Sequence, residues 1–557
     1  MSGNDPMRAV SLLLGVFRHR RAAARAAAGS EGVAVVNGAE SLLRTLADAG
    51  VEVCFSNPGT TELHLVGALD KVPRMRAVLG LFEGVATGAA DGYARIAGKP
   101  AATLLHLGPG LGHGLSNLHN ARRANTPIVN IVGDHPTYHK PYDPPLESDI
   151  ETVARSLRGP VRRPANVAAV RQDAVSALAE ALEPPGQIAT LIMPADVSWS
   201  DGVAADGDGN RPATPIRPVP PVAPRLIEQV AGVLCSGEPS ALVIGGPLGR
   251  EAGLCAASRI AAGTGTRVLL ETYSSRLEHG AGLPSFPRLG FYPDQVLRQL
   301  DGVRHVIVAG TSVPVAFFAY PDKPSRLVPD GAQTHVLAEV GQDAVAALTA
   351  LADLVAPDRE PVVTAAGRPA MPSGPLTVDT WPAVIGALLP ERAIVVDETI
   401  SSGIGLSAAT AGAPRHDVLA MCGGAMGEGL PLAVGAAVAA PDRPVIALEA
   451  DGCAIYTLSA LWTQARENLD ITNVILNNRS YAILREEWQH LGAGASDPHT
   501  NRLLDLTGPD IDFVGLARAF GVPGSRASTA EELAEQFARA VAEPGPHLIE
   551  AVIPPVA

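Results

Sequence analysis

Short apolar runs alternate along the chain with longer stretches of helical periodicity. This alternation predicts strands separated by helices, and therefore an α/β fold of doubly wound parallel sheets. The runs that we expect to be strands are residues 51–55, 78–81, 101–105, 128–132 and 188–193 in the first third, 241–244, 267–271, 306–309 and 335–337 in the middle, and 393–396, 445–448, 471–476 and 547–552 in the last.

Two segments rich in Pro and Gly interrupt this pattern and are expected to be linkers. They divide the chain into three units of ordinary domain size. The first and last units have similar patterns, as if one design were used twice. The expected order is an extension at 1–33, a first domain at 34–200, a linker at 201–223, a central domain at 224–355, a linker at 356–375 and a last domain at 376–557.

The formal net charge of −14 argues against nucleic acid or an anionic membrane as the main partner. The five cysteines form no Cys-x-x-Cys pair. This usage indicates a reducing, cytoplasmic environment, with neither a zinc site nor disulfides. No apolar run is long and uncharged enough to span a bilayer.

Residues 1–33 differ from the rest of the chain, because four arginines lie among alanines after the apolar residues 10–17. One interpretation is an amphipathic targeting or membrane-touching helix. The plainer interpretation, which we prefer, is a poorly ordered extension that precedes the folded part.

Candidate chemistry follows the strands at 445–448 and 471–476. The first leads into Asp451-Gly452, and the second ends in Asn477-Asn478. Because parallel strands end on the same edge of a sheet, Asp451 and Asn478 should lie close together. Their oxygens suit Mg²⁺, and Gly452, just before the helix expected at 454–466, lets the backbone approach a phosphate. The alternative is an ordinary strand–turn–helix with a capping Asp.

This arrangement resembles the thiamine-diphosphate motif, Gly-Asp-Gly followed by Asn-Asn. Asn478 stands 27 positions after Asp451, and only the first Gly departs, as Ala450. From about residue 35 onward the chain resembles the thiamine-diphosphate-dependent family of acetolactate synthase and benzoylformate decarboxylase. The resemblance implies pyrimidine-binding, central and diphosphate-binding domains in that order. It also implies a homodimer or homotetramer, with active sites between the first domain of one subunit and the last domain of another.

The resemblance assigns further contacts to the last domain. Ser480 would add a backbone carbonyl to the metal held by Asp451 and Asn478. Met426 matches the bulky apolar residue that wedges beneath the cofactor, with a core methionine as the alternative. The other cofactor-binding candidates are Gly424, Gly452, Cys453 and Ala454, and more weakly Ser401 and Tyr481.

Glu83 follows the strand at 78–81 and begins an Ala/Gly-rich helix, where the family keeps its activating glutamate. A carboxylic acid there faces the aminopyrimidine ring and stabilises the tautomer that removes the C2 proton of the thiazolium. The alternative is a solvated glutamate favoured by the helix dipole. Gly84 stands where acetolactate synthases usually have Gln.

His106 and Thr60 bear on the substrate. In benzoylformate decarboxylases a histidine at the position of His106 assists proton transfer, and Thr60 corresponds to a serine whose hydroxyl could bind the oxo-acid carboxylate. A buried, satisfied histidine is the alternative for His106. The second histidine of those decarboxylases is absent, because residues 313–318 are apolar. The loop expected at residues 107–113, together with Asp134-His135, is most similar to acetolactate synthase large-subunit homologues of actinobacteria.

The resemblance therefore implies decarboxylation of a 2-oxo acid, with pyruvate as donor, followed by carboligation as in acetolactate synthase. A benzoylformate-type decarboxylase that releases an aldehyde is the alternative. A regulatory or non-catalytic homologue is the alternative from another class. Thiamine diphosphate and Mg²⁺ are the implied cofactors. FAD stays open, because the glycine turn 245–249 lacks the GxGxxG order of a dinucleotide site.

Overall fold

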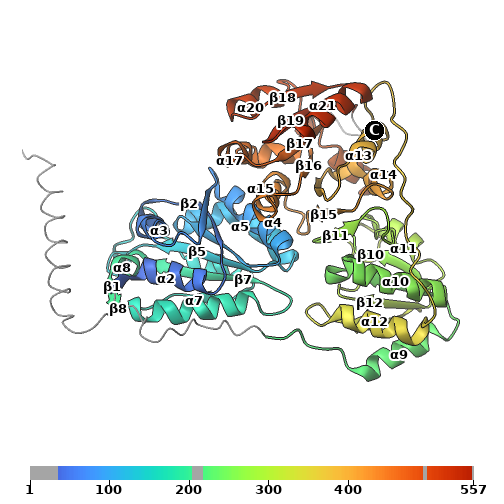
Figure 1. Ribbon diagram of the computed structural model, residues 1–557, viewed down its shortest axis with the longest axis horizontal. Helices are drawn as coiled ribbons and strands as arrows, with labels where there is room; N and C mark the ends of the chain where they lie inside the picture. The colour runs from blue at the N-terminus through green and yellow to red at the C-terminus, as the bar shows by residue number, and fades with distance from the viewer. Residues whose placement is uncertain (1–34, 204–216, 493–497, 555–557) are drawn as a thin grey trace, which may run out of the picture.

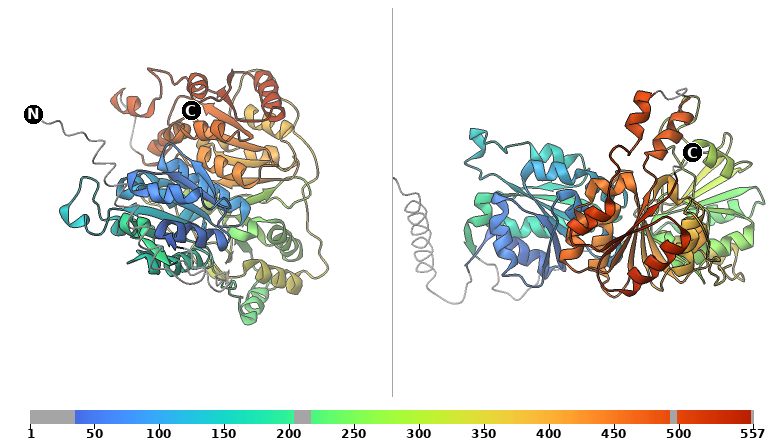
Figure 2. Two further views of the ribbon diagram at one scale, coloured as in Figure 1. Left: turned by 60° about the vertical axis from the view of Figure 1, so that its left-hand side comes forward. Right: turned by 90° about the horizontal axis from the view of Figure 1, so that it is seen from above.

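A computed structural model describes residues 35–203, 217–492 and 498–554 (Figure 1). The extension expected at 1–33 and most of the linker expected at 201–223 lie outside these residues. Three large sheets define a first, a central and a last unit, coloured blue to teal, green to yellow and orange to red. Seen from above, the last unit overlaps the central one, and the first unit lies to their left (Figure 2, right). None of the described helices combines the length and the apolar character needed to cross a membrane.

The first sheet is parallel throughout, with strand order β3-β2-β4-β5-β7-β6. Its strands are β2 (Val53–Asn57), β3 (Arg76–Leu79), β4 (Ala101–Leu105), β5 (Ile128–Asp134), β6 (Val161–Arg162) and β7 (Ile188–Pro194). Its helices are α2 (Gly38–Asp48), η1 (Thr60–Glu62), α3 (Leu63–Leu69), α4 (Glu83–Ala97), α5 (Leu107–Arg123), η2 (Lys140–Tyr142), α6 (Ile150–Arg155), α7 (Val167–Ala181) and α8 (Ala195–Trp199). A small antiparallel pair, β1 (Val35–Asn37) with β8 (Asp201–Val203), closes the unit.

Both faces of this sheet are buried, because successive side chains along its strands enter two different cores. Along β5, Val129 and Ile131 join one core with α2 and α7, whereas Ile128 and Val132 join another core with α4 and α5. Side chains on a strand point to opposite faces in turn, so a strand covered on both sides is apolar throughout. This is the doubly wound arrangement that the sequence predicts.

The central sheet has four parallel strands in the order β10-β9-β12-β13. They are β9 (Ser240–Ile244), β10 (Arg267–Leu270), β12 (His305–Ala309) and β13 (Gln333–Ala338). The accompanying helices are α9 (Pro224–Leu234), η4 (Gly246–Gly249), α10 (Glu251–Thr264), α11 (Pro293–Gln299) and α12 (Ala344–Val355). Residues 356–375, which the sequence predicts to be a linker, contain no helix or strand.

The last sheet has the order β11-β15-β14-β16-β17-β19-β18. Its strands are β11 (Leu277–His279), β14 (Ile394–Glu398), β15 (His416–Ala420), β16 (Val445–Ala450), β17 (Ile471–Asn477), β18 (Gly524–Ala527) and β19 (His547–Val552). Its helices are α13 (Thr380–Leu388), η5 (Ile400–Gly403), α14 (Leu406–Thr410), α15 (Gly429–Ala439), α16 (Asp451–Ala454), η6 (Ile455–Thr457), α17 (Ala460–Arg466), α18 (Ala482–His490), α19 (Pro498–Leu504), α20 (Phe513–Ala519) and α21 (Ala530–Ala542). β11 comes from the central part of the sequence and pairs antiparallel with β15.

Two local expectations from the sequence are wrong. Residues 107–113 form the start of α5 instead of a loop, because Pro109 lies in the first helical turn, where its missing N–H costs no intrahelical bond. The single helix expected at 454–466 is divided into α16, η6 and α17. There the hydroxyl of Thr457 donates to the carbonyl of Gly427 at 3.0 Å, which holds the intervening turn against a neighbouring loop.

Helices α4 and α15 pack closely between the first and last units (Figure 1). A Cβ atom on Gly92 would lie 2.1 Å from the carbonyl oxygen of Leu432, and one on Gly435 would lie 1.9 Å from that of Ala89. Only glycine allows the two backbones to approach so closely. The small residues of both helices therefore fix the first and last units against each other.

Candidate active site

The carboxyl ends of β3, β2 and β4 carry a row of ionisable side chains. Glu83 follows β3, Glu62 follows β2 and His106 follows β4. Because these three strands are neighbours in the first sheet, their side chains meet at one edge. In an open α/β sheet this edge is where ligands bind.

Glu83 is the first residue of α4, and only 6% of it is exposed. Its Oε2 lies 3.0 Å from Nδ1 of His113 on α5. A Cβ atom on Gly110 would come within 3.0 Å of Oε1, so the glycine makes room for the carboxyl group. Glu83 is therefore a buried acid held between two helices, which fits the role predicted from the sequence better than a solvated helix end.

His106 pairs with Glu62, which sequence reasoning did not single out. Nδ1 of His106 lies 2.7 Å from Oε2 of Glu62, and this fully buried carboxylate accepts the N–H of Gly59 at 2.9 Å. The hydroxyl beside the pair belongs to Thr61, which donates to Oε1 of Glu62 at 2.5 Å, whereas Thr60 is exposed. A carboxylate on Nδ1 orients the imidazole and leaves its other nitrogen available for proton transfer.

The last sheet brings Asp451 and Asn478 to one edge, as the sequence predicts. They follow the adjacent parallel strands β16 and β17, and Ala450 pairs with Leu476 in register. Only 2% of Asp451 and 3% of Asn478 is exposed. The Oδ1 and Oδ2 atoms of Asp451 accept N–H groups of Gly452 and Arg479 at 2.8 and 2.7 Å, and Oδ1 of Asn478 accepts that of Ser480 at 2.9 Å.

The other candidates surround this pair with less direct contacts. Cys453 and Ala454 are buried in the first turn of α16, whose N-terminus favours an anion. A Cβ atom on Gly452 would lie 2.5 Å from the ring of Tyr481, so this ring covers the glycine. Ser401 is half-buried, but the serine near Asn478 is Ser402, whose Oγ lies 3.5 Å from Nδ2 of Asn478.

Residues 423–427 carry Gly424 and Met426 and lie against helix α5 of the first unit. Nδ2 of Asn120 donates to the carbonyl of Ala425 at 2.7 Å, and Nδ2 of Asn117 donates to that of Gly427 at 3.2 Å. Met426 is half-buried, and Gly424 has a φ of +76° with the ring of Phe317 against it. The two asparagines stand at i and i+3, a spacing that puts them on one helix face and that sequence reasoning did not use.

Comparison with known proteins identifies the family in which these features occur. The model for the N-terminal TPP binding domain of thiamine pyrophosphate enzymes matches residues 36–153, and that for the C-terminal TPP binding domain matches residues 403–551. A Mycobacterium tuberculosis protein named "Putative acetolactate synthase large subunit IlvX" is 57% identical over 520 residues, 93% of this chain and 99% of that protein. The chain belongs to the thiamine pyrophosphate enzyme family.

Two decarboxylases are also similar to this chain over most of its length, at lower identity. Benzoylformate decarboxylase of Pseudomonas aeruginosa is 30% identical over 524 residues, 90% of this chain and 96% of that enzyme. The structure of the Rhodococcus jostii 4-hydroxybenzoylformate decarboxylase superposes with a TM-score of 0.81 at 26% identity, over 93% of this chain and 99% of that one. The family resemblance inferred from the motif at 451–478 is thus confirmed.

The chemistry of the residues fits the cofactor of a thiamine pyrophosphate enzyme with a bound cation. Burial raises the pKa of Asp451 to about 6, although N–H groups of the following residues oppose this shift. A cation beside the carboxylate would stabilise its charged form. No three His, Cys, Asp or Glu side chains of the described residues gather as a metal site. A cation here would therefore combine Asp451 with neutral oxygens and phosphate, which suits Mg²⁺.

The glycine turn of the central unit does not fit a second, nucleotide-type cofactor. The N–H of Gly246 donates at 2.8 Å to Oε1 of Glu271, whose Oε2 accepts the hydroxyl of Thr311 at 2.8 Å. Pro247 has no N–H to offer. The carboxyl group of Glu271 thus already accepts the N–H of Gly246, which leaves that N–H unavailable to a phosphate of FAD.

Proposed function

We propose that this chain removes CO₂ from a 2-oxo acid and joins the remaining acyl unit to a second carbonyl compound, as an acetolactate synthase does, with pyruvate as the donor. The observation that carries the proposal is the buried Glu83 at the ligand edge of the first sheet. The same chain keeps the buried pair of Asp451 and Asn478 at the edge of its last sheet. A homologue without activity would not need both features.

The residues of the last unit would hold the cofactor. Asp451, Asn478 and the carbonyl of Ser480 would bind Mg²⁺, and the backbone amides of Cys453 and Ala454 would bind the diphosphate. Thiamine diphosphate, when bound, supplies the electron sink for breaking the bond between the oxo carbon and its carboxylate. Met426 would support it from below.

Glu83 would hold a proton at the pyrimidine ring of the cofactor. In the proposed assembly, at least a dimer, this carboxyl group comes from the first unit of one subunit, and the cofactor rests on the last unit of another. The acidic side chain of Glu83 is shielded from water, so its proton is directed to the ligand. The name of the 57% identical mycobacterial relative supports carboligation as the outcome.

Release of an aldehyde is the second candidate, and a specific observation favours it. His106 is held through Nδ1 by the buried Glu62, and a quarter of its side chain is exposed, so the imidazole is a placed acid at the same sheet edge. Protonating the decarboxylated substrate requires such a group. Benzoylformate decarboxylase and 4-hydroxybenzoylformate decarboxylase are named among the similar proteins.

The test supplies thiamine diphosphate, Mg²⁺ and pyruvate to the purified protein and follows CO₂ and acetolactate, with benzoylformate in parallel. Acetolactate formed by the natural protein and lost in Glu83→Gln supports the first proposal. An aldehyde from benzoylformate without acetolactate supports the second. Cofactor binding without turnover of either substrate contradicts both and favours the non-catalytic homologue.

A further inference from the structure

His113 is the exposed polar group in contact with the buried carboxyl group of Glu83. Nδ1 of the ring lies 3.0 Å from Oε2, and 59% of the His113 side chain is exposed against 7% of that of Glu83. The imidazole therefore connects a shielded acid with the space outside it.

The backbone around this contact fixes its geometry. The hydroxyl of Thr87 donates to the carbonyl of Gly114 at 3.1 Å, and Nδ2 of Asn117 donates to the carbonyl of Gly84 at 2.8 Å. These bonds connect the N-terminal part of α4 to α5 next to the contact. The ring of Phe82 packs on that of His113, with centroids 5.6 Å apart. His113 is thus held opposite Glu83 from two helices.

The other histidine at this edge is engaged elsewhere. His106 directs Nδ1 to Glu62, and the first turn of α5 separates the two pairs, since Gly110 lies between Oε1 of Glu83 and Cβ of His106. Glu62 is therefore paired with His106, and Glu83 with His113. Among the described contacts, Glu83 is the ionisable group that touches His113.

An acid that exchanges a proton with its ligand in every turnover must also exchange protons with water. Imidazole accepts and donates protons near neutral pH, so it can carry out this exchange for a buried carboxyl group. We propose that His113 is a positioning residue that holds the carboxyl group of Glu83 and passes protons between it and water. In this step the Oε2–H bond breaks as Nδ1–H forms, and Nε2 releases its proton to water. The inference rests on the proposed role of Glu83.

The contact itself is tested in the protein without cofactor, by ¹⁵N NMR of ring-labelled histidines. Glu83→Gln should move the Nδ1 signal of His113, which is assigned by its disappearance in His113→Gln. Glu543→Gln, which alters the distant pair with His547, should leave that signal in place. A His113 signal that Glu83→Gln does not move overturns the proposal, whatever the substrate of the enzyme.

The relay is tested by the rate at which the C2 proton of bound thiamine diphosphate exchanges with deuterium, which needs no substrate. We expect His113→Ala to slow this exchange at least tenfold, to bind thiamine diphosphate within threefold of the natural affinity, and to recover part of the rate with added imidazole. His113→Gln should show the same loss, and the central-unit variant His335→Gln should stay within twofold. Unchanged exchange, loss of cofactor binding, or no recovery with imidazole would overturn the relay. Exchange that persists in Glu83→Gln would instead overturn the proposed role of Glu83.

Discussion

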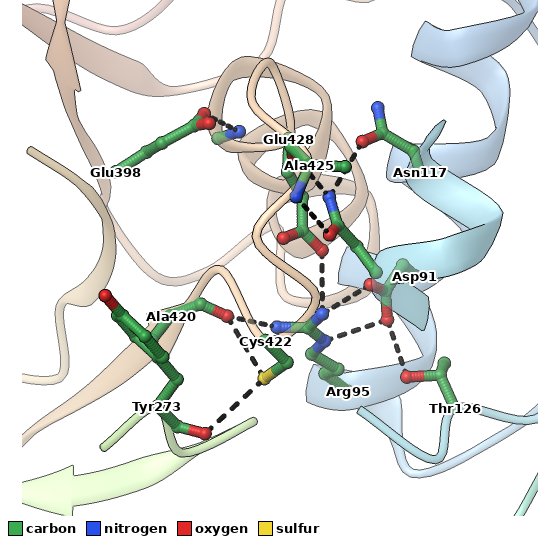
Figure 3. A network of polar contacts seen from close by, with 12 residues as sticks. Asp91, Arg95, Asn117, Thr126, Tyr273, Glu398, Ala420, Cys422, Ala425 and Glu428 are labelled. Carbon is green, nitrogen blue, oxygen red and sulfur yellow. Dashed lines mark hydrogen bonds and ion pairs between the residues drawn. The ribbon is translucent and has the colours of Figure 1, made fainter. Parts of the chain in front are cut away.

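The guanidinium group of Arg95 lies 2.7 Å from the carboxylate of Glu428, 333 residues later in the chain (Figure 3). Arg95 also binds Asp91, whose carboxylate accepts the hydroxyl of Thr126 at 2.6 Å. Burial raises the pKa of Glu428 well above its ordinary value, and the charge of Arg95 opposes that shift. Since Arg95 lies on α4 and Glu428 directly precedes α15, this pair joins the first unit to the last.

Replacing Arg95 by Met should therefore cost stability, because it leaves two buried carboxylates without a cation. Removing one partner of a buried pair costs about 3–5 kcal/mol. Urea unfolding followed by circular dichroism measures the loss. The exposed pair of Arg392 and Asp442 provides the control, and Arg392→Met should leave the midpoint unchanged. Equal midpoints for the two variants would contradict the structural role of Arg95.

The pair of Arg95 and Glu428 also marks a limit of prediction from the sequence, because its members lie 333 residues apart. Local apolar runs predicted most of the strands of the three large sheets, and residues 101–105 and 547–552 agree with β4 and β19 in both bounds. They missed the interior strand β15, the edge strands β6, β11 and β18, and the small pair β1 and β8. The spacing of Asp451 and Asn478 located the metal-site candidates, because the positions of both residues depend only on where two neighbouring strands end. Contacts such as Glu62 with His106 depend on strand order and helix packing, which no local pattern encodes.

Asp451 should be the main determinant of cation-dependent cofactor binding, because it is the carboxylate of the candidate Mg²⁺ site. We expect Asp451→Ala to weaken thiamine diphosphate binding in the presence of Mg²⁺ on the order of 100-fold, or about 2.7 kcal/mol. Asn478→Ala should weaken it less, since a neutral oxygen is lost. Isothermal titration calorimetry, with and without EDTA, measures both effects. If EDTA weakens thiamine diphosphate binding equally in the natural protein and in Asp451→Ala, Asp451 is not a ligand of the cation. Asp442→Ala, at the surface, is the control and should bind as the natural protein does.

Burial of His279 should make the protein sensitive to acid. Its Nε2 lies 2.9 Å from the carbonyl of Ser407, and desolvation lowers the pKa of the ring from 6.5 to about 4. Above pH 6.5 the ring is neutral in both states, so its contribution is complete. Below pH 6.5 only the unfolded state binds the proton, and stability falls until about pH 4. The loss amounts to about 3 kcal/mol.

His279→Gln should flatten this dependence when the free energy of unfolding is measured by urea titration from pH 7 to pH 4. Part of the acid sensitivity should persist, because burial also lowers the pKa of the neighbouring His416. His139, exposed before η2, serves as the matched control, and His139→Gln should keep the full slope. An unchanged slope in His279→Gln would refute the assignment.

Glu62 should determine how well His106 acts as an acid. Glu62→Gln keeps an acceptor for the N–H of Gly59 but removes the charge beside Nδ1. Since general acid–base catalysis contributes about 10²–10⁴-fold, we expect aldehyde formation from benzoylformate to fall by about 10-fold or more. Acetolactate formation should fall less, because carboligation does not require protonation at that carbon.

Product analysis by chromatography measures both outcomes in the same variant. Thr61→Ala should reproduce part of the effect, since Thr61 binds Glu62, and Thr60→Ala tests the hydroxyl that the sequence singled out. A Glu62→Gln protein with an unchanged ratio of aldehyde to acetolactate would show that His106 does not protonate the product.

Glu271 should keep the central unit free of flavin. The strand order β10-β9-β12-β13 reverses between β9 and β12, where open α/β sheets bind nucleotides, and a cavity of about 490 Å³ lies beside this point. Yet the carboxyl group of Glu271 already accepts the N–H of Gly246, where a phosphate would bind. Burial raises the pKa of Glu271 to about 7. Because a carboxyl oxygen accepts an N–H whether or not the group is protonated, Glu271 can hold the turn in both forms.

We therefore expect the purified protein to lack the visible absorbance of a flavin and to bind no FAD in a fluorescence titration. Glu271→Gln, which can still accept the N–H of Gly246, should behave in the same way. Glu271→Ala would free that N–H for an anionic ligand in a cavity whose lining includes Arg250 and Arg276. Stoichiometric flavin in the natural protein would contradict this reasoning, because the phosphate would then have displaced Glu271 from its hydrogen bonds to Gly246 and Thr311.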